Sequence, residues 1–236
     1  MIKAGILARR ELAAYFYSPI AYVVACAFLV ITGYFFAVEL IEIKQATLRF
    51  ALSNTVVVMI FVVPFMTMHL LAEEWKSGTI EPLMTDPVTD WDVVLGKFIA
   101  GVGVMAFLFV PTLVYVVILK AVGEPEMGPI FTTYVGLLLM GCEYVAIGLF
   151  ASSLTRSQIV AAMVSFAILL MLLIVSWVSD GKTGFALEWL AYLGIRHHLE
   201  SFQKGIIDTK DVVYYLSTTA LFLFFTVRIV ETRKWK

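Results

Sequence analysis

The chain has 236 residues, of which 61% are hydrophobic and 15% are charged, whereas soluble domains carry roughly 25% charged residues. A mean hydropathy of +0.93 indicates an integral membrane protein, with one membrane domain over residues 1–236 and almost no sequence left for a soluble domain. The formal net charge of −1 and the lack of a basic stripe argue against a nucleic-acid partner.

Residues 1–18 combine Lys3, Arg9 and Arg10 with apolar side chains and precede Pro19. This mixture predicts an amphipathic helix that lies in the membrane interface and ends before the proline. A signal peptide is the competing interpretation. The next apolar run, at 20–38, is too long for the hydrophobic part of a signal peptide and has no convincing cleavage site. We therefore expect the first spanning helix at 20–38.

Five further apolar runs approach the roughly 20 residues that a spanning helix needs. Pro64 and Pro111 fall inside two of them, where membrane helices tolerate proline and kink. We expect an all-α fold with six membrane-spanning helices, and short outer helices in the segment 179–211 before the last span. The five further runs are 55–71, 93–119, 131–154, 159–178 and 212–230.

Six spans place both termini on one side of the membrane, and the Lys and Arg residues decide which side this is. The densest clusters of these residues lie at the two termini, which predicts that both termini and the loop at 73–92 are cytoplasmic. The Lys and Arg residues on that side are Lys3, Arg9, Arg10, Lys76, Lys97, Arg156, Arg228, Arg233, Lys234 and Lys236.

The loop at 73–92 lies between two apolar runs and holds six of the 18 carboxylates. Unpaired charges and irregular backbone find no partners in hydrocarbon, so this segment must protrude into water. Within it, Ile80, Leu83 and Met84 have helical spacing and predict a short helix that ends before Pro87.

Both flanks of this short helix carry helix-end signals. Ser77, Gly78 and Thr79 predict the end of the incoming helix and a cap for the next one. Thr89 followed by Asp92 three residues later resembles a capping box, which would open the next long helix.

The pattern Glu-Glu-x-x-Ser-Gly-Thr-Ile-Glu at 73–81, followed by Pro-Val and Gly-Lys-Phe, resembles the first cytoplasmic loop of type-2 ABC exporter permeases. The likeness is greatest to the gliding-motility-type branch and extends to 9–22, 148–155 and 157–162. In that family the loop forms a coupling helix that docks into a groove of the ATPase subunit. Trp75 stands where the family usually has a basic residue. Pro82 replaces a usual leucine, so we expect the coupling helix to start at Glu81.

The resemblance implies which residues and partners take part in coupling. The implied partners are an ABC ATPase subunit, a second permease copy or paralogue, an auxiliary protein with an extracytoplasmic domain, and the lipid of a bacterial inner membrane. The sequence has no Gly-x4-Gly-Lys-Ser/Thr stretch, so we expect ATP to bind to the partner subunit and this chain to need no cofactor. The implied coupling residues are Glu73, Glu74, Lys76, Gly78, Thr79, Glu81 and Leu83.

Three other patterns fit ordinary membrane-protein structure better than a reactive site. The letters at 101–106 match a dinucleotide fingerprint, but they lie in an apolar span without a preceding strand and predict helix packing. His197, His198 and Glu200 could bind a metal, but adjacent histidines on a helix diverge and nothing nearby completes a site. We therefore expect them to be structural surface residues. His69 is expected to lie in the interface, and Cys26 and Cys142 are expected to be reduced core residues.

Glu143 is an acidic residue near the middle of the fourth span. A charged group costs roughly 2.5–3.5 kcal/mol at that depth, so its side chain should face protein or a water-filled cavity. One interpretation is a protonated carboxyl group hydrogen-bonded inside the bundle. The other is an intramembrane polar site in a pathway or gate.

These patterns predict a non-enzymatic permease subunit of an exporter-type ABC transporter, which moves a substrate across the membrane when a separate ATPase hydrolyses ATP. The alternative is a mechanotransmitting membrane subunit that acts on extracytoplasmic partners without carrying a solute. A membrane enzyme would need converging reactive groups, and Glu143 alone does not suffice. A passive anchor would not need an acidic, capped loop.

Overall fold

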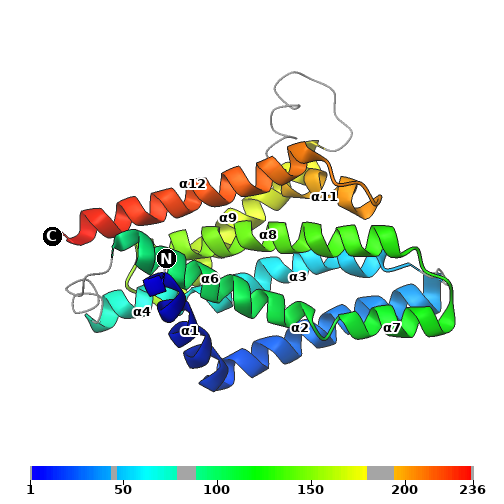
Figure 1. Ribbon diagram of the computed structural model, residues 1–236, viewed down its shortest axis with the longest axis horizontal. Helices are drawn as coiled ribbons and strands as arrows, with labels where there is room; N and C mark the ends of the chain where they lie inside the picture. Colours follow the sequence, from blue (N-terminus) through cyan, green and yellow to red (C-terminus); the bar gives the residue numbers. More distant parts are fainter. Residues whose placement is uncertain (1, 44–46, 79–88, 180–193, 235–236) are drawn as a thin grey trace.

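The computed structural model of the protein describes residues 2–43, 47–78, 89–179 and 194–234. Within these ranges the regular structure is helical, without a strand. The long helices lie side by side in one elongated bundle, and both termini are found toward the same end (Figure 1). Six of the helical runs are long and apolar enough to cross a membrane, which confirms the predicted all-α fold with six spans.

Most helix boundaries follow the local signals in the sequence. Ser18 is extended, and Pro19 occupies the first turn of the second helix. The third span divides at Pro111, because proline has no amide hydrogen to donate and the neighbouring amides bond three residues back, as Thr112 N does to the Phe109 carbonyl. The described helices are α1 Ile2–Tyr17, α2 Pro19–Val38, the π-helix η1 Glu39–Ile43, α3 Arg49–Thr67, α4 His69–Ser77, α6 Asp90–Phe109, α7 Leu113–Val122, α8 Met127–Leu154, α9 Gln158–Ser179, α11 Ile195–Gln203 and α12 Thr209–Lys234.

The second span begins at Arg49, six residues before the predicted start. A carboxylate from the preceding span explains the difference. Glu39 is buried, and its Oε1 accepts hydrogen bonds from Thr47 Oγ1 at 2.9 Å and from the Phe50 amide at 3.0 Å. Its Oε2 accepts one from the Ala51 amide at 2.9 Å. Glu39 therefore caps α3 from a distance in sequence, and the apolar pattern could not predict it.

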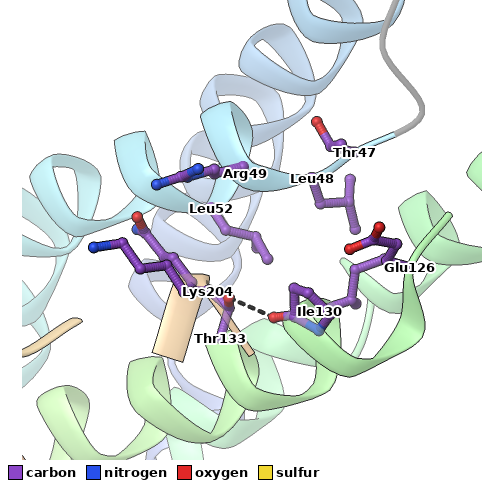
Figure 2. Close-up of a pocket in the computed structure, with 10 residues that line it drawn as sticks. Thr47, Leu48, Arg49, Leu52, Glu126, Ile130, Thr133 and Lys204 are labelled. Carbon is purple, nitrogen blue, oxygen red and sulfur yellow. Dashed lines mark hydrogen bonds between the residues drawn. The ribbon is translucent and has the colours of Figure 1, made fainter. Parts of the chain in front are cut away.

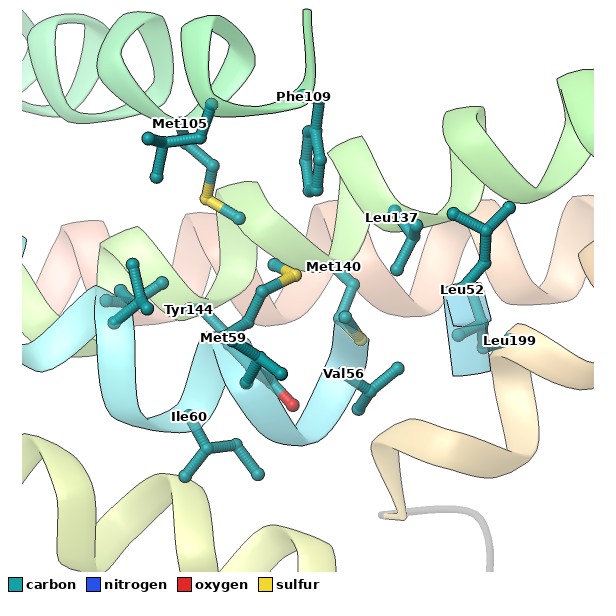
Figure 3. Close-up of a cluster of buried hydrophobic side chains, with 14 of the residues drawn as sticks. Leu52, Val56, Met59, Ile60, Met105, Phe109, Leu137, Met140, Tyr144 and Leu199 are labelled. Atoms are coloured by element: carbon teal, nitrogen blue, oxygen red, sulfur yellow. The ribbon is translucent and has the colours of Figure 1, made fainter. Parts of the chain in front are cut away.

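The centre of the bundle is formed by α3 and α8. In the spans that contain α3 and α8, 72% of the most apolar stretch is buried inside the bundle. In the other four spans the buried share is 22–33%. Side chains from α3, α6 and α8 meet there, and Met59, Met105 and Met140 lie around Tyr144 in the core (Figure 3). The fold therefore has two inner spanning helices and four outer ones.

Glycines set how closely the helices approach. A Cβ on Gly148 of α8 would lie 2.1 Å from Thr67 Oγ1 of α3, and one on Gly96 of α6 would lie 2.9 Å from Leu7 Cδ2 of α1. Gly101 meets Val145 of α8 in the same way. The letters at 101–106 therefore serve helix packing, as predicted, because only glycine leaves room for these contacts.

The first helix, α1, runs steeply across the long axis of the bundle near the end that holds the termini (Figure 1). Ala4, Leu7 and Ala8 are buried, whereas Arg9 and Arg10 are exposed. This two-sided character agrees with the predicted amphipathic helix. Its position in the membrane interface stays a prediction.

Candidate coupling site

The incoming side of the predicted coupling loop is the short helix α4, which ends at Ser77. Gly78 follows with φ 71°, a left-handed conformation that closes the helix and that residues with a Cβ rarely adopt. Glu73 and Lys76 are exposed on α4, and Glu74 is half-buried. Of the other predicted coupling residues, Thr79, Glu81 and Leu83 lie outside the described residues, as does the predicted helix from Glu81.

The outgoing side of the loop is the capped start of α6. Asp92 N donates to Thr89 Oγ1 at 3.2 Å, and Thr89 N donates to Asp92 Oδ2 at 3.2 Å. This reciprocal pair is the predicted capping box. It fixes the point at which α6 begins.

A buried ionic cluster joins this region to three helices. Lys97 of α6 is 1% exposed, and its Nζ lies 2.7 Å from Glu74 Oε1 of α4 and 3.3 Å from Glu11 Oε1 of α1. A buried ammonium group needs such partners, because its desolvation is costly unless opposite charges and hydrogen bonds compensate for it. The sequence prediction included Glu74 but missed Lys97 and Glu11. The available signal was a lysine in an apolar helix, close to the acidic end of another.

The cluster lies beside a cavity of about 470 Å³ at the same end of the bundle. Tyr15 and His69 line it and stack on each other, with ring centroids 5.6 Å apart. Burial raises the pKa of the Tyr15 hydroxyl well above its usual range, so this group stays neutral. The cavity holds charged and polar side chains where α1, α4 and α6 meet.

A serine of α8 holds the break between α3 and α4. Ser152 Oγ accepts hydrogen bonds from the amides of Leu71 at 3.0 Å and Ala72 at 2.9 Å, and donates one to the Met68 carbonyl at 3.0 Å. A side chain inserted into the helical hydrogen-bond ladder interrupts the helix at that point. The stretch 148–155 therefore forms the contact surface of α8 for α3 and α4. Gly148 allows α3 to approach α8 closely, and Ser152 makes the hydrogen bonds to the backbone between α3 and α4.

This arrangement has six candidate spans, with α4 held to α6 on one side of the segment 73–92 and the capping box of α6 on the other, and it agrees with a known family. The profile of the ABC-2 family transporter proteins matches residues 13–230. The chain belongs to this family. It is 30% identical over 108 residues to the probable multidrug ABC transporter permease YbhR of Escherichia coli strain K12, and to the same degree to YbhR of Escherichia coli O157:H7. The aligned stretch covers 46% of this chain and 27% of each relative, so the chain matches about a quarter of the length of these curated relatives.

The chain is therefore a multi-pass ABC-2 permease. The gliding-motility branch stays a prediction, because the matches identify only the wider family. The mechanotransmitting alternative finds no support in these relatives.

The departure from the family pattern at Trp75 has a structural counterpart in the permease. The guanidinium of Arg233, near the end of α12, lies 5.0 Å from the centroid of the Trp75 ring. Arg233 Nη2 also donates to the carbonyl of Leu154 at the end of α8. A cation from another helix thus sits over the aromatic ring that replaces the usual basic residue, and it ties α12 to α4 and α8.

Glu143 of α8 is completely buried in the permease. Neither carboxyl oxygen has a hydrogen-bond partner among the described residues. The described residues therefore do not supply the hydrogen bond that the first interpretation of Glu143 requires. A role in a polar pathway stays a prediction.

The prediction that the histidine pair lies on the surface is wrong for His198, which lies at the other end of the bundle. His198 is 2% exposed, so it is not a surface residue. Its Nδ1 lies 2.7 Å from Asp211 Oδ1, and its ring stacks on Tyr214 with centroids 3.9 Å apart. This contact holds α11 against α12. No group of three or more potential metal ligands occurs within the described part of the chain.

Proposed function

We propose that this permease is the membrane half of an exporter-type ABC transporter and that the segment 73–92 receives the motion of a separate ATPase subunit. The observation that carries the proposal is the buried cluster of Lys97, Glu74 and Glu11. It connects the helix that enters the loop to the helix that leaves it, and both to α1. ATP binds to the partner subunit in this proposal.

The attachments of α4 suggest how a push on the loop is transmitted. Ser152 fixes the start of α4 to α8, Lys97 fixes Glu74 to α6, and Arg233 contacts Trp75 from α12. With three attachments to other helices, α4 cannot shift by bending at a single point of the chain. A displacement of α4 moves α6, α8 and α12 together, which tilts helices that line both sides of the bundle. Packed helices respond as rigid bodies rather than by continuous deformation.

The complex that follows from this proposal contains two permease subunits in the inner membrane of a bacterium, with cytoplasmic termini and two ATPases below them. The most apolar stretches of the spans that contain α2 and α9 are only 22% and 28% buried in the single chain. Their apolar faces are therefore open to a second copy or paralogue and to lipid. An auxiliary protein with an extracytoplasmic domain is a further proposed partner. The name of the E. coli relative makes drugs the first substrates to test.

Co-purification tests this function most directly. We expect the tagged chain, extracted from its native membrane in a mild detergent, to bring with it a subunit that carries a Gly-x4-Gly-Lys-Ser/Thr stretch and hydrolyses ATP. A permease that purifies without any such subunit, under conditions that keep other membrane complexes intact, argues against the proposal.

Two variants with matched controls then locate the docking surface. Gly78→Val forces a β-branched side chain into a left-handed conformation, whereas Gly5→Val places the same side chain in open space on α1. Glu81→Lys reverses a charge in the loop, whereas Glu124→Lys reverses one at the other end of the bundle. We expect the first member of each pair to lower ATPase association and turnover, and the control to retain both. Equal behaviour within each pair would exclude docking at this segment.

A further inference from the structure

A second hollow, of about 500 Å³, lies at the end of the bundle away from the termini. Its walls come from η1, the start of α3, the end of α9 and the start of α11. Arg49 and Arg196 line it together with Trp177 and Leu173. Two cationic side chains from different helices thus border one concave space.

Both guanidinium groups lack an ionic partner within the described ranges of the chain, where the ion pairs involve other residues. Among the described residues, the one acid that lines the hollow is Glu39, and its two oxygens are already bonded to Thr47 and to the first amides of α3. Glu39 therefore sets one negative charge, held by these hydrogen bonds, against the two positive charges of Arg49 and Arg196. The hollow has a net positive rim.

The rest of the lining combines the polar side chains of Thr47, Ser53 and Asn54 with apolar ones. Val56 and Val57 of α3 and Leu173 of α9 form the inner wall, and Trp177 stands 56% exposed near the end of its span. Tryptophan favours the level of the lipid headgroups, and arginines near helix ends extend toward the same level. A cationic rim above an apolar wall matches a ligand with an anionic head and hydrocarbon tails.

Arg49 also borders a smaller pocket of about 300 Å³, shown in Figure 2. Thr47 lines both spaces, and the smaller one is also lined by the cation Lys204 and the acid Glu126. The arginine therefore stands between two adjoining hollows at this end of the bundle. Arginines that only extend toward bulk lipid need not line the same concave space, as Arg49 and Arg196 do.

We propose that the hollow between α3 and α9 binds one phospholipid with an anionic headgroup, with Arg49 and Arg196 holding the phosphate and the acyl chains lying along α3 and α9. This site requires only that the chain spans a membrane. It does not depend on the docking of an ATPase or on transport.

Lipid binding to the purified full-length chain in a neutral detergent tests the proposal. The probes are dioctanoylphosphatidylglycerol and dioctanoylphosphatidylcholine, with bound lipid counted by native mass spectrometry during titration. We expect the anionic lipid to bind about thirtyfold more tightly, at roughly fivefold for each arginine. Inorganic phosphate should compete only at much higher concentration, because it lacks the acyl chains.

The matched variants decide whether the preference belongs to this hollow. Arg49→Gln with Arg196→Gln should abolish it, and each single variant should lower it about fivefold, which keeps the test readable if the double variant does not fold. Lys120→Gln with Lys210→Gln removes two exposed cations at the same end that do not line the hollow and should leave the preference intact. Three results would overturn the proposal: equal binding of the two lipids, an equal loss in the lysine control, or phosphate binding as tight as that of the anionic lipid.

Discussion

The buried contacts of Lys97 lead to a quantitative prediction about stability. Its Nζ lies 2.7 Å from Glu74 Oε1 and 3.3 Å from Glu11 Oε1, and the side chain is 1% exposed. Lys97→Met keeps the length of the side chain but removes the charge. Removing one partner of a buried pair costs about 3–5 kcal/mol. The two carboxylates keep 15–16% of their exposure, so we expect the loss of unfolding free energy to lie nearer about 2–3 kcal/mol.

A double-mutant cycle isolates the contribution of the pair. Glu74→Gln alone leaves the Lys97 ammonium with only its longer contact to Glu11, whereas Glu74→Gln with Lys97→Met leaves a neutral contact between α4 and α6. The double variant should therefore lose less than the sum of the two single losses, by about 1–3 kcal/mol. Lys76→Met is the control, since Lys76 is an exposed lysine on α4 that forms no ion pair among the described residues, and it should change stability by no more than about 0.5 kcal/mol.

The assay is denaturant unfolding of the purified chain in mixed micelles, followed by tryptophan fluorescence. Additive losses, within about 0.5 kcal/mol, would falsify the argument that Lys97 and Glu74 form one stabilising unit. A Lys97→Met variant no less stable than Lys76→Met would do the same. The same variants then test the link to function, because a weaker joint between α4 and α6 should lower ATP-driven activity even in assembled complexes.

The same titration tests two further residues. Ser152→Ala removes a hydroxyl that bonds three backbone groups at the break between α3 and α4, and we expect a loss of about 1–3 kcal/mol. The Ser153 hydroxyl donates only within α8, so Ser153→Ala should lower the free energy of unfolding less. Equal losses would contradict the proposed role of Ser152 at the break between α3 and α4. Glu143→Leu removes a buried carboxyl group without a partner among the described residues, so it should leave stability unchanged or raise it by about 1–3 kcal/mol. Glu143→Gln should keep fold and transport, and an assembled but inactive Gln variant would instead place Glu143 in a polar pathway.

The Ser152 contact also gives a physical reason for the small residues in the stretch 148–155. Gly148 lets α3 approach, and Ser152 satisfies backbone groups that would otherwise face an apolar bundle. Irregular backbone at membrane depth is tolerated only where protein buries it and supplies partners. A larger or apolar residue at either position would separate α3 from α8 or leave those groups unpaired.

The sequence by itself determined the all-α membrane fold, the six spans and several helix ends. Hydrocarbon accepts little besides apolar helices, so composition and run length predict them directly. The helix ends at Pro19 and Gly78 and the capping box of Thr89 and Asp92 depend on residues within a single turn. Local chemistry of this kind is visible without a structure.

Only the tertiary structure decided which distant groups meet. Glu11 and Lys97 are 86 positions apart, and Leu71 and Ser152 are 81 apart. Apolar helices in a membrane can pack in many arrangements, since hydrocarbon gives little preference for one contact over another. The observed arrangement is selected by a few glycines that allow close approach and by buried polar groups that must find partners. The ionic cluster of Lys97, Glu74 and Glu11 and the buried His198 depend on that selection, and no local pattern could predict it.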